Sequence, residues 1–225
     1  MKRKVIGRTP PLVEANDGVC CVKKTRCNMN KLFGVKYSNK SLFNFLRDLL
    51  LFFIFYSIIG WIYEELLFII EDNVLCNRGV LFGPWLPIYG FGGLVIVGIF
   101  YRFKEKKVKI GKINIRPIVL FIESVIFATL TELFATYIID FIGGNFKNLW
   151  DYSDRLLNFQ GRIALIPDLK FGIVALIGIY LIQPLLIKFV TMKDQKKVNI
   201  VFIILSVLFF ADVIARYWLG PNFKG

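Results

Sequence analysis

Acidic side chains within long apolar runs are the residues of this sequence best suited to do chemistry. Glu132 lies near the middle of the run over residues 117–142, too deep for a short side chain to reach water. It belongs to a small or polar stripe that recurs every four residues: Ser124, Ala128, Glu132, Thr136 and Asp140. Such a stripe faces other helices or a wet cavity, so we expect Glu132 in a buried polar site, with plain helix packing as the alternative.

A second polar face lies in the run over residues 49–70. Ser57, Gly60 and Glu64 are spaced i, i+3 and i+7, so they share one side of a helix. Glu64 and Glu65 fall near the end of that run. Either they reach water at the interface, or one of them meets a buried cation or an arginine.

Two connectors between apolar runs carry uncommon combinations of residues. Residues 77–92 hold an arginine among prolines, glycines and aromatic residues, and residues 150–162 hold Trp-Asp-Tyr-Ser followed by Asn, Gly and Arg. A rigid loop with an interfacial Trp and Tyr would explain the first connector alone. The candidates for substrate binding or gating are Glu64, Asn77, Arg78, Tyr89, Glu132, Asp151, Tyr152, Asn158 and Arg162.

Glu132 needs a partner from another segment, because its own run contains no basic residue. Burial raises the pKa of a carboxyl group, whereas a nearby arginine lowers it. We therefore expect Glu132 to be either protonated at neutral pH or held ionised by Arg78 or Arg162.

The last two apolar runs each contain one notable polar feature. Pro184 follows Gln183 and should kink or end its helix. Asp212 and Arg216 are spaced i, i+4 and are expected to pair with one another.

The sequence argues against several kinds of chemistry. It contains no histidine, the commonest metal ligand and general base, and its four cysteines lack the paired spacing of a zinc or iron–sulfur site. No Walker A pattern occurs, so any coupling to ATP must come from another chain. We predict no metal and no cofactor, and we assign no catalytic residue.

The chain that positions these residues is too apolar for an ordinary soluble domain. Of its 225 residues, 56% are hydrophobic and 16% are aromatic. The charges are segregated between long apolar runs, whereas a transmembrane barrel would show short alternating segments. We predict an all-α fold, a polytopic transmembrane helical bundle in the plasma membrane. About five spans are expected, near residues 49–70, 85–101, 117–142, 171–189 and 198–219.

Lysine and arginine gather before the first span, after the second and after the fourth, and they are sparse in the other connectors. This alternation predicts a cytoplasmic N-terminus and an outside C-terminus, and it explains the net charge of +13 without a nucleic-acid partner. Residues 1–41 are basic and polar, so we expect a disordered cytoplasmic tail there and a transmembrane helical domain over residues 42–225. Met29 offers a second start for translation.

Several of these pieces occur together, in the same order, in a known family. They are Tyr56-Ser57 with Gly60-Trp61 and Glu64, Asn77-Arg78-Gly79, Gly83-Pro84 with Pro87-Ile88-Tyr89-Gly90, Trp150-Asp151-Tyr152-Ser153, and Asn158 with Gly161-Arg162. Over about residues 50–190 the chain resembles the putative ABC-transporter type IV family of small bacterial multispanning membrane proteins. Glu132 and Pro184 fall where the family has a glutamate and a proline, whereas Phe171-Gly172 departs from its usual Trp-Gly pair. The resemblance implies a permease-like component and adds no catalytic residue.

Three functions are compatible with these observations. The first is an ABC transporter permease-like subunit whose outer-face polar site, built from the two connectors, binds or gates a solute beside a separate ATP-binding subunit. The second, less favoured without histidine, is a membrane-embedded enzyme acting on lipid or prenyl-linked substrates. Its acid or base would be Glu132 or Glu64, and its phosphate-holding residue Arg78 or Arg162. The third is a scaffold or regulator in the lipid bilayer that holds another membrane protein or a second copy of the chain.

Overall fold

The computed structural model describes residues 31–37, 42–72, 79–104, 106, 108–148 and 150–220. Its elements are, in chain order, β1 (Lys31–Leu32), β2 (Val35–Lys36), α2 (Leu42–Asp72), α3 (Pro87–Phe100), the 3-10 turn η1 (Tyr101–Phe103), β3 (Lys109–Ile110), β4 (Ile113–Asn114), α4 (Arg116–Phe141), the 3-10 turn η2 (Phe146–Asn148), β5 (Asn158–Phe159), β6 (Ile163–Ala164), α5 (Leu165–Ile177), the π-helical turn η3 (Gly178–Ile182), α6 (Gln183–Val190) and α7 (Gln195–Leu219). The strands pair only within short antiparallel hairpins in this part of the chain, so the predicted all-α fold is confirmed.

The helices account for the predicted membrane bundle. Within the described residues, four helical segments are long and apolar enough to cross a membrane: Leu42–Ile70, Arg116–Phe141, Leu165–Val190 and Gln195–Leu219. The segment Pro87–Phe103, predicted as the shortest span, is apolar but shorter than these four. A short helix of this kind either spans a locally thinned bilayer or is re-entrant and crosses only part of it.

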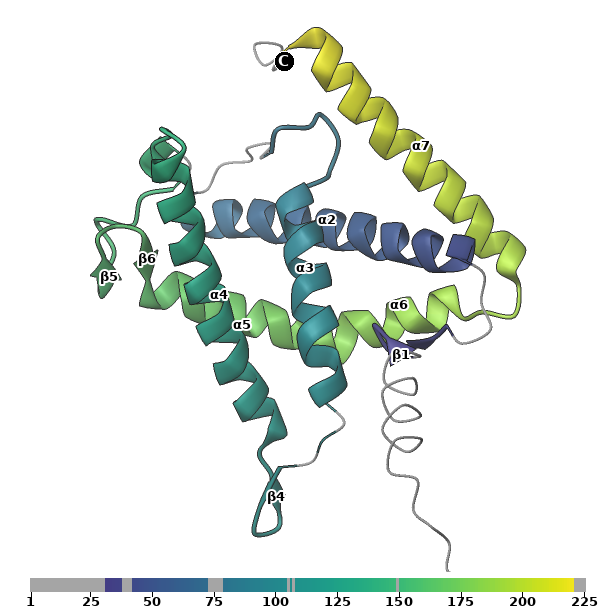
Figure 1. The fold of residues 1–225 in the computed structure, drawn as a ribbon, viewed down its shortest axis with the longest axis horizontal. Helices are drawn as coiled ribbons and strands as arrows, with labels where there is room; N and C mark the ends of the chain where they lie inside the picture. Colours follow the sequence, from purple (N-terminus) through teal and green to yellow (C-terminus); the bar gives the residue numbers. More distant parts are fainter. Residues whose placement is uncertain are drawn as a thin grey trace, which may run out of the picture.

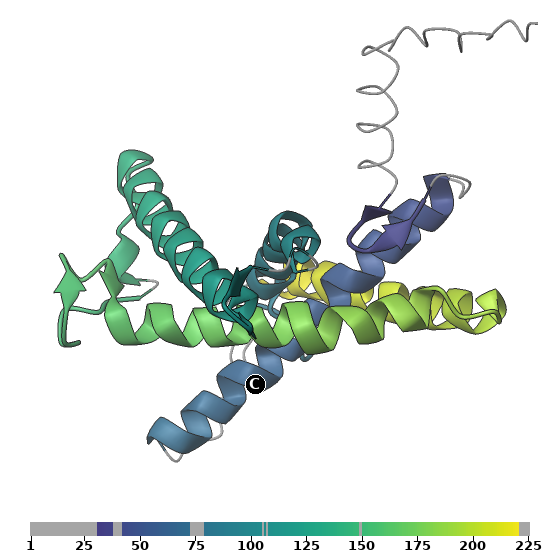
Figure 2. The ribbon, with the colours of Figure 1, turned by 90° about the horizontal axis from the view of Figure 1, so that it is seen from below.

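The helices pack in pairs around α3. Helix α2 packs across α3, α4 packs across α5, and α7 turns back from the end of α6 towards α2 (Figure 1). Turned by 90°, the molecule shows α2 crossing the long α5–α6 segment at an angle, with α3 lying near the crossing (Figure 2). The main core joins α2, α3, α6 and α7 through Leu51, Phe52, Val97, Ile179, Val190 and Val198.

The β1–β2 hairpin closes one end of this core. Its two-residue turn has positive φ at Phe33 (52°) and Gly34 (82°), the geometry of a type I′ hairpin turn. Val35 is buried, and Gly34 lies against Tyr101 and Ile187. The hairpin thus meets the connector after α3 and the end of α6, three segments expected on one side of the membrane. Apart from residues 31–37, the predicted tail over 1–41 lies outside the described residues.

Gln183 ties this hairpin to two helices. The hydroxyl of Tyr56 donates to Gln183 Oε1 at 2.8 Å, and Gln183 Nε2 donates to the carbonyl of Phe33 at 2.7 Å. Just before Gln183 the helix widens into the π turn η3, and it resumes as α6 with Pro184 in its first turn. Proline lacks an N–H group and its ring crowds the preceding turn, so the irregularity predicted at Pro184 takes the form of a π segment.

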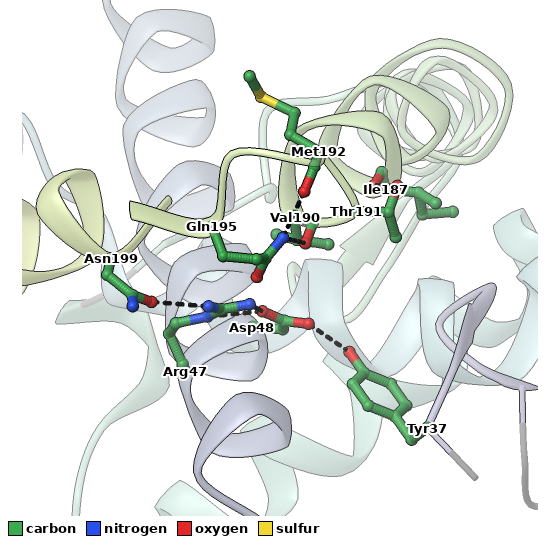
Figure 3. A network of polar contacts seen from close by, with 9 residues as sticks. All are labelled: Tyr37, Arg47, Asp48, Ile187, Val190, Thr191, Met192, Gln195 and Asn199. Atoms are coloured by element: carbon green, nitrogen blue, oxygen red, sulfur yellow. Dashed lines mark hydrogen bonds and ion pairs between the residues drawn. The ribbon is translucent and has the colours of Figure 1, made fainter. Parts of the chain in front are cut away.

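A buried ion pair lies near the start of α2 (Figure 3). Arg47 Nη2 lies 2.6 Å from Asp48 Oδ1, and both side chains are almost completely buried. Arg47 Nη1 donates to Asn199 Oδ1 of α7 at 2.7 Å, and the hydroxyl of Tyr37 donates to Asp48 Oδ2 at 3.3 Å. The first helix begins at Leu42, before the predicted start of the span at residue 49, and it therefore includes both members of this pair, whose charges neutralise each other.

Glycines set the spacing between α2 and α3. A Cβ atom added at Gly60 would clash with the side chain of Tyr89, and one at Gly90 or Gly93 would clash with side chains of α2. Gly92, on the same helix, faces open space. The contact therefore depends on three particular glycines that let the two backbones approach closely.

Candidate functional site

Asp212 of α7 holds the loop that precedes α3. Its carboxylate accepts hydrogen bonds from the backbone N–H of Phe82 at 3.1 Å, from that of Gly83 at 2.7 Å and from Trp85 Nε1 at 2.7 Å. The expected pairing of Asp212 with Arg216 gives way to these contacts, because a carboxylate is well satisfied by converging N–H donors. Arg216 lies over the ring of Phe82, 5.4 Å from its centroid.

Tyr89 and Glu64 meet across the contact between α2 and α3. The hydroxyl of Tyr89 donates a short hydrogen bond to Glu64 Oε1, and its ring lies against Gly60 one turn away. The structure therefore places Tyr89 of the first connector beside Glu64 of α2, two of the residues predicted for the site. Asn77 and Arg78, the other two candidates in this connector, lie outside the described residues.

The second connector is a compact loop held by its own polar residues. Asp151 Oδ1 accepts from the backbone N–H and the hydroxyl of Ser153, at 2.9 and 2.5 Å. Asn158 Nδ2 donates to the carbonyls of Ser153 and Arg155 at 3.2 and 2.8 Å, and Asn158 Oδ1 accepts from the N–H of Gly161 at 3.0 Å. The hydrogen bonds from Ser153 lower the pKa of Asp151. Asp151 and Asn158 thus shape the loop.

Tyr152 connects this loop to the polar stripe of α4 by hydrogen bonds. Its N–H donates to the carbonyl of Gly161 at 2.9 Å, and its hydroxyl donates to Glu132 Oε1 at 3.1 Å. Burial raises the pKa of Tyr152, and the negative charge of nearby carboxyl groups raises it further. Those groups belong to Glu132, Asp168 and Glu64. The phenol therefore stays protonated at neutral pH and remains a donor.

Asp168 is a member of this site that the sequence analysis did not single out. It lies in the first turn of α5, only 5% exposed, and Thr129 and Glu132 of α4 lie beside its carboxyl group. Glu132 Oε2 and Asp168 Oδ1 are both buried, and among the described residues neither accepts a hydrogen bond from an N–H or hydroxyl donor, although the two carboxyl groups lie next to each other. The fourth span was expected to begin at Phe171, which left Asp168 in a connector. Because α5 begins at Leu165, the acid is instead part of a helix packed on α4.

Arg162 pairs with Asp140 and not with Glu132, for which the sequence offers Arg162 as one of two alternative arginine partners. Its Nη2 lies 2.6 Å from Asp140 Oδ2, and its guanidinium lies 4.4 and 4.3 Å from the ring centroids of Tyr137 and Phe146. Asp140 is two helical turns closer than Glu132 to the end of α4, where the loop carrying Arg162 returns. The arginine therefore meets an acid and two aromatic faces before it can reach Glu132.

The family of the chain follows from a comparison with known proteins. The model of the family described as Putative ABC-transporter type IV matches residues 51–217, most of the chain and both motif connectors. The chain belongs to this family. Comparison of this type IV family member with curated proteins and with solved structures gave no match.

In this ABC-transporter type IV family member, acids and tyrosines from four helices and one loop form what we call the acid–tyrosine cluster: Glu64, Tyr89, Glu132, Tyr152 and Asp168. Among the residues with described positions, no lysine or arginine forms an ion pair with Glu132 or Asp168. The cluster presents buried acceptor oxygens and phenol donors, so it suits a proton donor or a cation better than an anion.

A cavity of about 330 Å³ adjoins the cluster at Asp168. Helices α4 and α5 form one side of it, and the β5–β6 hairpin forms the other. It is lined by Val125, Thr129, Leu157, Asn158, Phe159, Ile163, Ala164, Leu165 and Asp168. Most of this wall is apolar, so a ligand there would have an apolar body and a single polar end.

Proposed function

We propose that this chain is a transport-related subunit of the plasma membrane in which the acid–tyrosine cluster binds or gates a solute. The observation that carries the proposal is the contact between Glu132 and Asp168, two acids on facing helices that each qualify as a candidate span. Acidic groups within a span are costly and typically mark a solute or ion pathway. Membership of an ABC-transporter-type family favours transport.

In this proposal the cluster lies near the outer end of the bundle, below the two motif loops. ATP hydrolysis belongs to a separate subunit, because the sequence has no phosphate-cradling loop before a helix. The enzyme alternative would need an arginine to hold a phosphate near the two acids. Arg162 pairs with Asp140 through Nη2 and forms no ion pair with either acid, although its Nε and Nη1 have no hydrogen-bond partner among the described residues, so it does not favour that alternative.

The test is whether an ATP-hydrolysing complex depends on these acids. The tagged full-length chain is purified from its native membranes after crosslinking, and the ATPase rate of the recovered complex is measured in nanodiscs. We expect Glu132→Gln and Asp168→Asn to lower that rate about tenfold or more, because a loss of about 1.4 kcal/mol already gives a factor of ten. Asp154→Asn, which changes an exposed acid of the loop without a named role in the site, should leave the rate unchanged.

Two results would contradict the proposal. One is recovery of the intact chain with no ATP-hydrolysing subunit. The other is an ATPase rate that neither Glu132→Gln nor Asp168→Asn alters, although both variants assemble normally.

A further inference from the structure

We infer that the cavity beside Asp168 binds a primary ammonium group carried on a small apolar body. The inference rests on the proposed function, because it names the class of solute that the same site would accept. It is carried by three features of the described residues: an unpartnered buried oxygen, an apolar wall, and a local excess of acids.

The unpartnered oxygen is Asp168 Oδ1. The side chain is 5% exposed and lines the cavity, yet this oxygen has no hydrogen-bond partner. Buried polar atoms of folded proteins are nearly always hydrogen-bonded, so an exception at a cavity wall indicates a missing donor. The second such oxygen, Glu132 Oε2, belongs to the neighbouring acid on α4.

The wall limits the rest of the ligand. Besides Asp168, only Thr129 and Asn158 contribute polar side chains to the cavity, and Asn158 is already engaged in holding its loop. The remaining lining residues are apolar, so the body of the ligand must be apolar as well. A volume of about 330 Å³ accommodates a molecule with a short hydrocarbon body.

The acidic side chains at the cavity determine which polar group the ligand can carry. Tyr152 already donates to Glu132 Oε1, so the open positions next to it are acceptors. An anion would be repelled by the two acids, and no group of three or more His, Cys, Asp or Glu side chains able to hold a metal ion occurs in the described part of the chain. An ammonium group has three donors and one positive charge, which suits the Asp168 carboxylate and the Thr129 hydroxyl in the cavity wall, with the acidic Glu132 beside Asp168.

The binding test uses the full-length chain in phosphatidylcholine nanodiscs, whose headgroup has no N–H donor. Hexylamine is titrated, and binding is followed by calorimetry and by the thermal unfolding midpoint, which rises when a ligand binds only the folded state. We expect saturable binding of hexylamine and none of hexanol or hexanoate. Asp168→Asn should weaken the Kd at least about tenfold. Asp154→Asn, which changes an exposed acid of the loop before the β5–β6 hairpin, should leave it unchanged.

A second variant keeps both acids and fills the cavity. Ala164 is buried in the cavity wall, and Ala164→Leu should weaken hexylamine binding by a similar factor. This variant decides the matter if Asp168→Asn does not fold. Hexylamine binding that survives in the folded variants, or equal binding of hexanol, would overturn the inference.

The ammonium group has two natural sources, a free amine or the headgroup of phosphatidylethanolamine. Nanodiscs containing that lipid separate them: competition with hexylamine identifies the headgroup, and undiminished binding identifies a free amine. The two proposals also fail separately. Binding of hexylamine that is lost in Asp168→Asn, together with an unaltered ATPase rate, would uphold this inference and contradict the proposed function.

Discussion

Two buried acids of this protein lie in opposite surroundings. Asp48 touches the guanidinium of Arg47 and accepts a hydrogen bond from Tyr37, so its charge is compensated within the fold. Asp168 is buried to a similar degree, but among the described residues it forms no ion pair, and another acid and a threonine lie beside its carboxyl group. The first arrangement holds helices together, and the second leaves an acceptor for something that the fold does not supply.

The compensated pair gives a prediction about stability. Arg47→Met leaves Asp48 buried without its counter-charge and should lower the free energy of unfolding by about 3–5 kcal/mol. Replacing Asp48 by leucine in the same chain should recover most of that loss. Thermal or denaturant unfolding in nanodiscs measures both changes.

An exposed ion pair supplies the control. Lys197 lies 3.6 Å from Asp194, and both side chains are well exposed. Lys197→Met should therefore cost less than about 1 kcal/mol. If Arg47→Met costs no more than Lys197→Met, the network in Figure 3 does not stabilise the fold.

Part of the candidate site is predictable from residue spacing. The stripe around Glu132 and the two unusual connectors brought out Tyr152 and Tyr89, which the structure places against acids. Asp168 was not predicted as a site residue, because the fourth span was expected to begin at Phe171, six residues after the actual start of α5 at Leu165. The ion-pair partner of Arg162 could not be predicted either, because residue spacing does not show where a loop returns to a helix. Because the loop returns near the end of α4, Arg162 forms its ion pair with Asp140.

At the scale of the elements, the contact between α2 and α3 can be tested by adding one methyl group. Gly60→Ala would push a Cβ into the side chain of Tyr89, and such overpacking should destabilise the protein by about 1–3 kcal/mol. It should also disturb the hydrogen bond between Tyr89 and Glu64. The thermal unfolding midpoint and crosslinking between the two helices measure the two effects.

Gly92→Ala is the matched control, because its added Cβ meets no atom within 4 Å. Alanine also favours the helix over glycine, so this change should be neutral or slightly stabilising. Equal destabilisation by the two substitutions would show that the glycines act through the backbone and not through close helix contact.

The elements divide clearly into those that a sequence pattern reveals and those that it does not. Long apolar runs identify the helices, because only helices satisfy their own backbone groups in an apolar setting. The strands of the β1–β2 hairpin have two residues each, too few for a periodic pattern, and the π turn before Pro184 depends on local crowding. The hydrogen bond of Arg47 near the start of α2 joins Asn199, a residue far along the chain that no local pattern connects to it.

For the whole molecule, the arrangement of basic connectors predicts which ends face the cytoplasm. In a chain whose four native cysteines are replaced by serine, Arg155→Cys should react with an impermeant thiol reagent added outside intact cells. Lys112→Cys, at the tip of the β3–β4 hairpin, should react only after the cells are opened. The reverse pattern would place both motif loops, and the acid–tyrosine cluster below them, on the cytoplasmic side.

The bond from Gln183 to Phe33 also has a consequence for biosynthesis. It joins residues 150 positions apart, and ribosomes add about 5–20 residues per second, so the hairpin emerges roughly 8–30 s before its partner is made. During that interval α2 and α3 are already made, but Val35 cannot be buried as in the folded protein, because the residues of α6 and α7 that complete its core have not been synthesised. The β1–β2 hairpin therefore completes its contacts late: the helices of the nascent chain are made one after another, and the hairpin can bond to Gln183 only once α6 has left the ribosome.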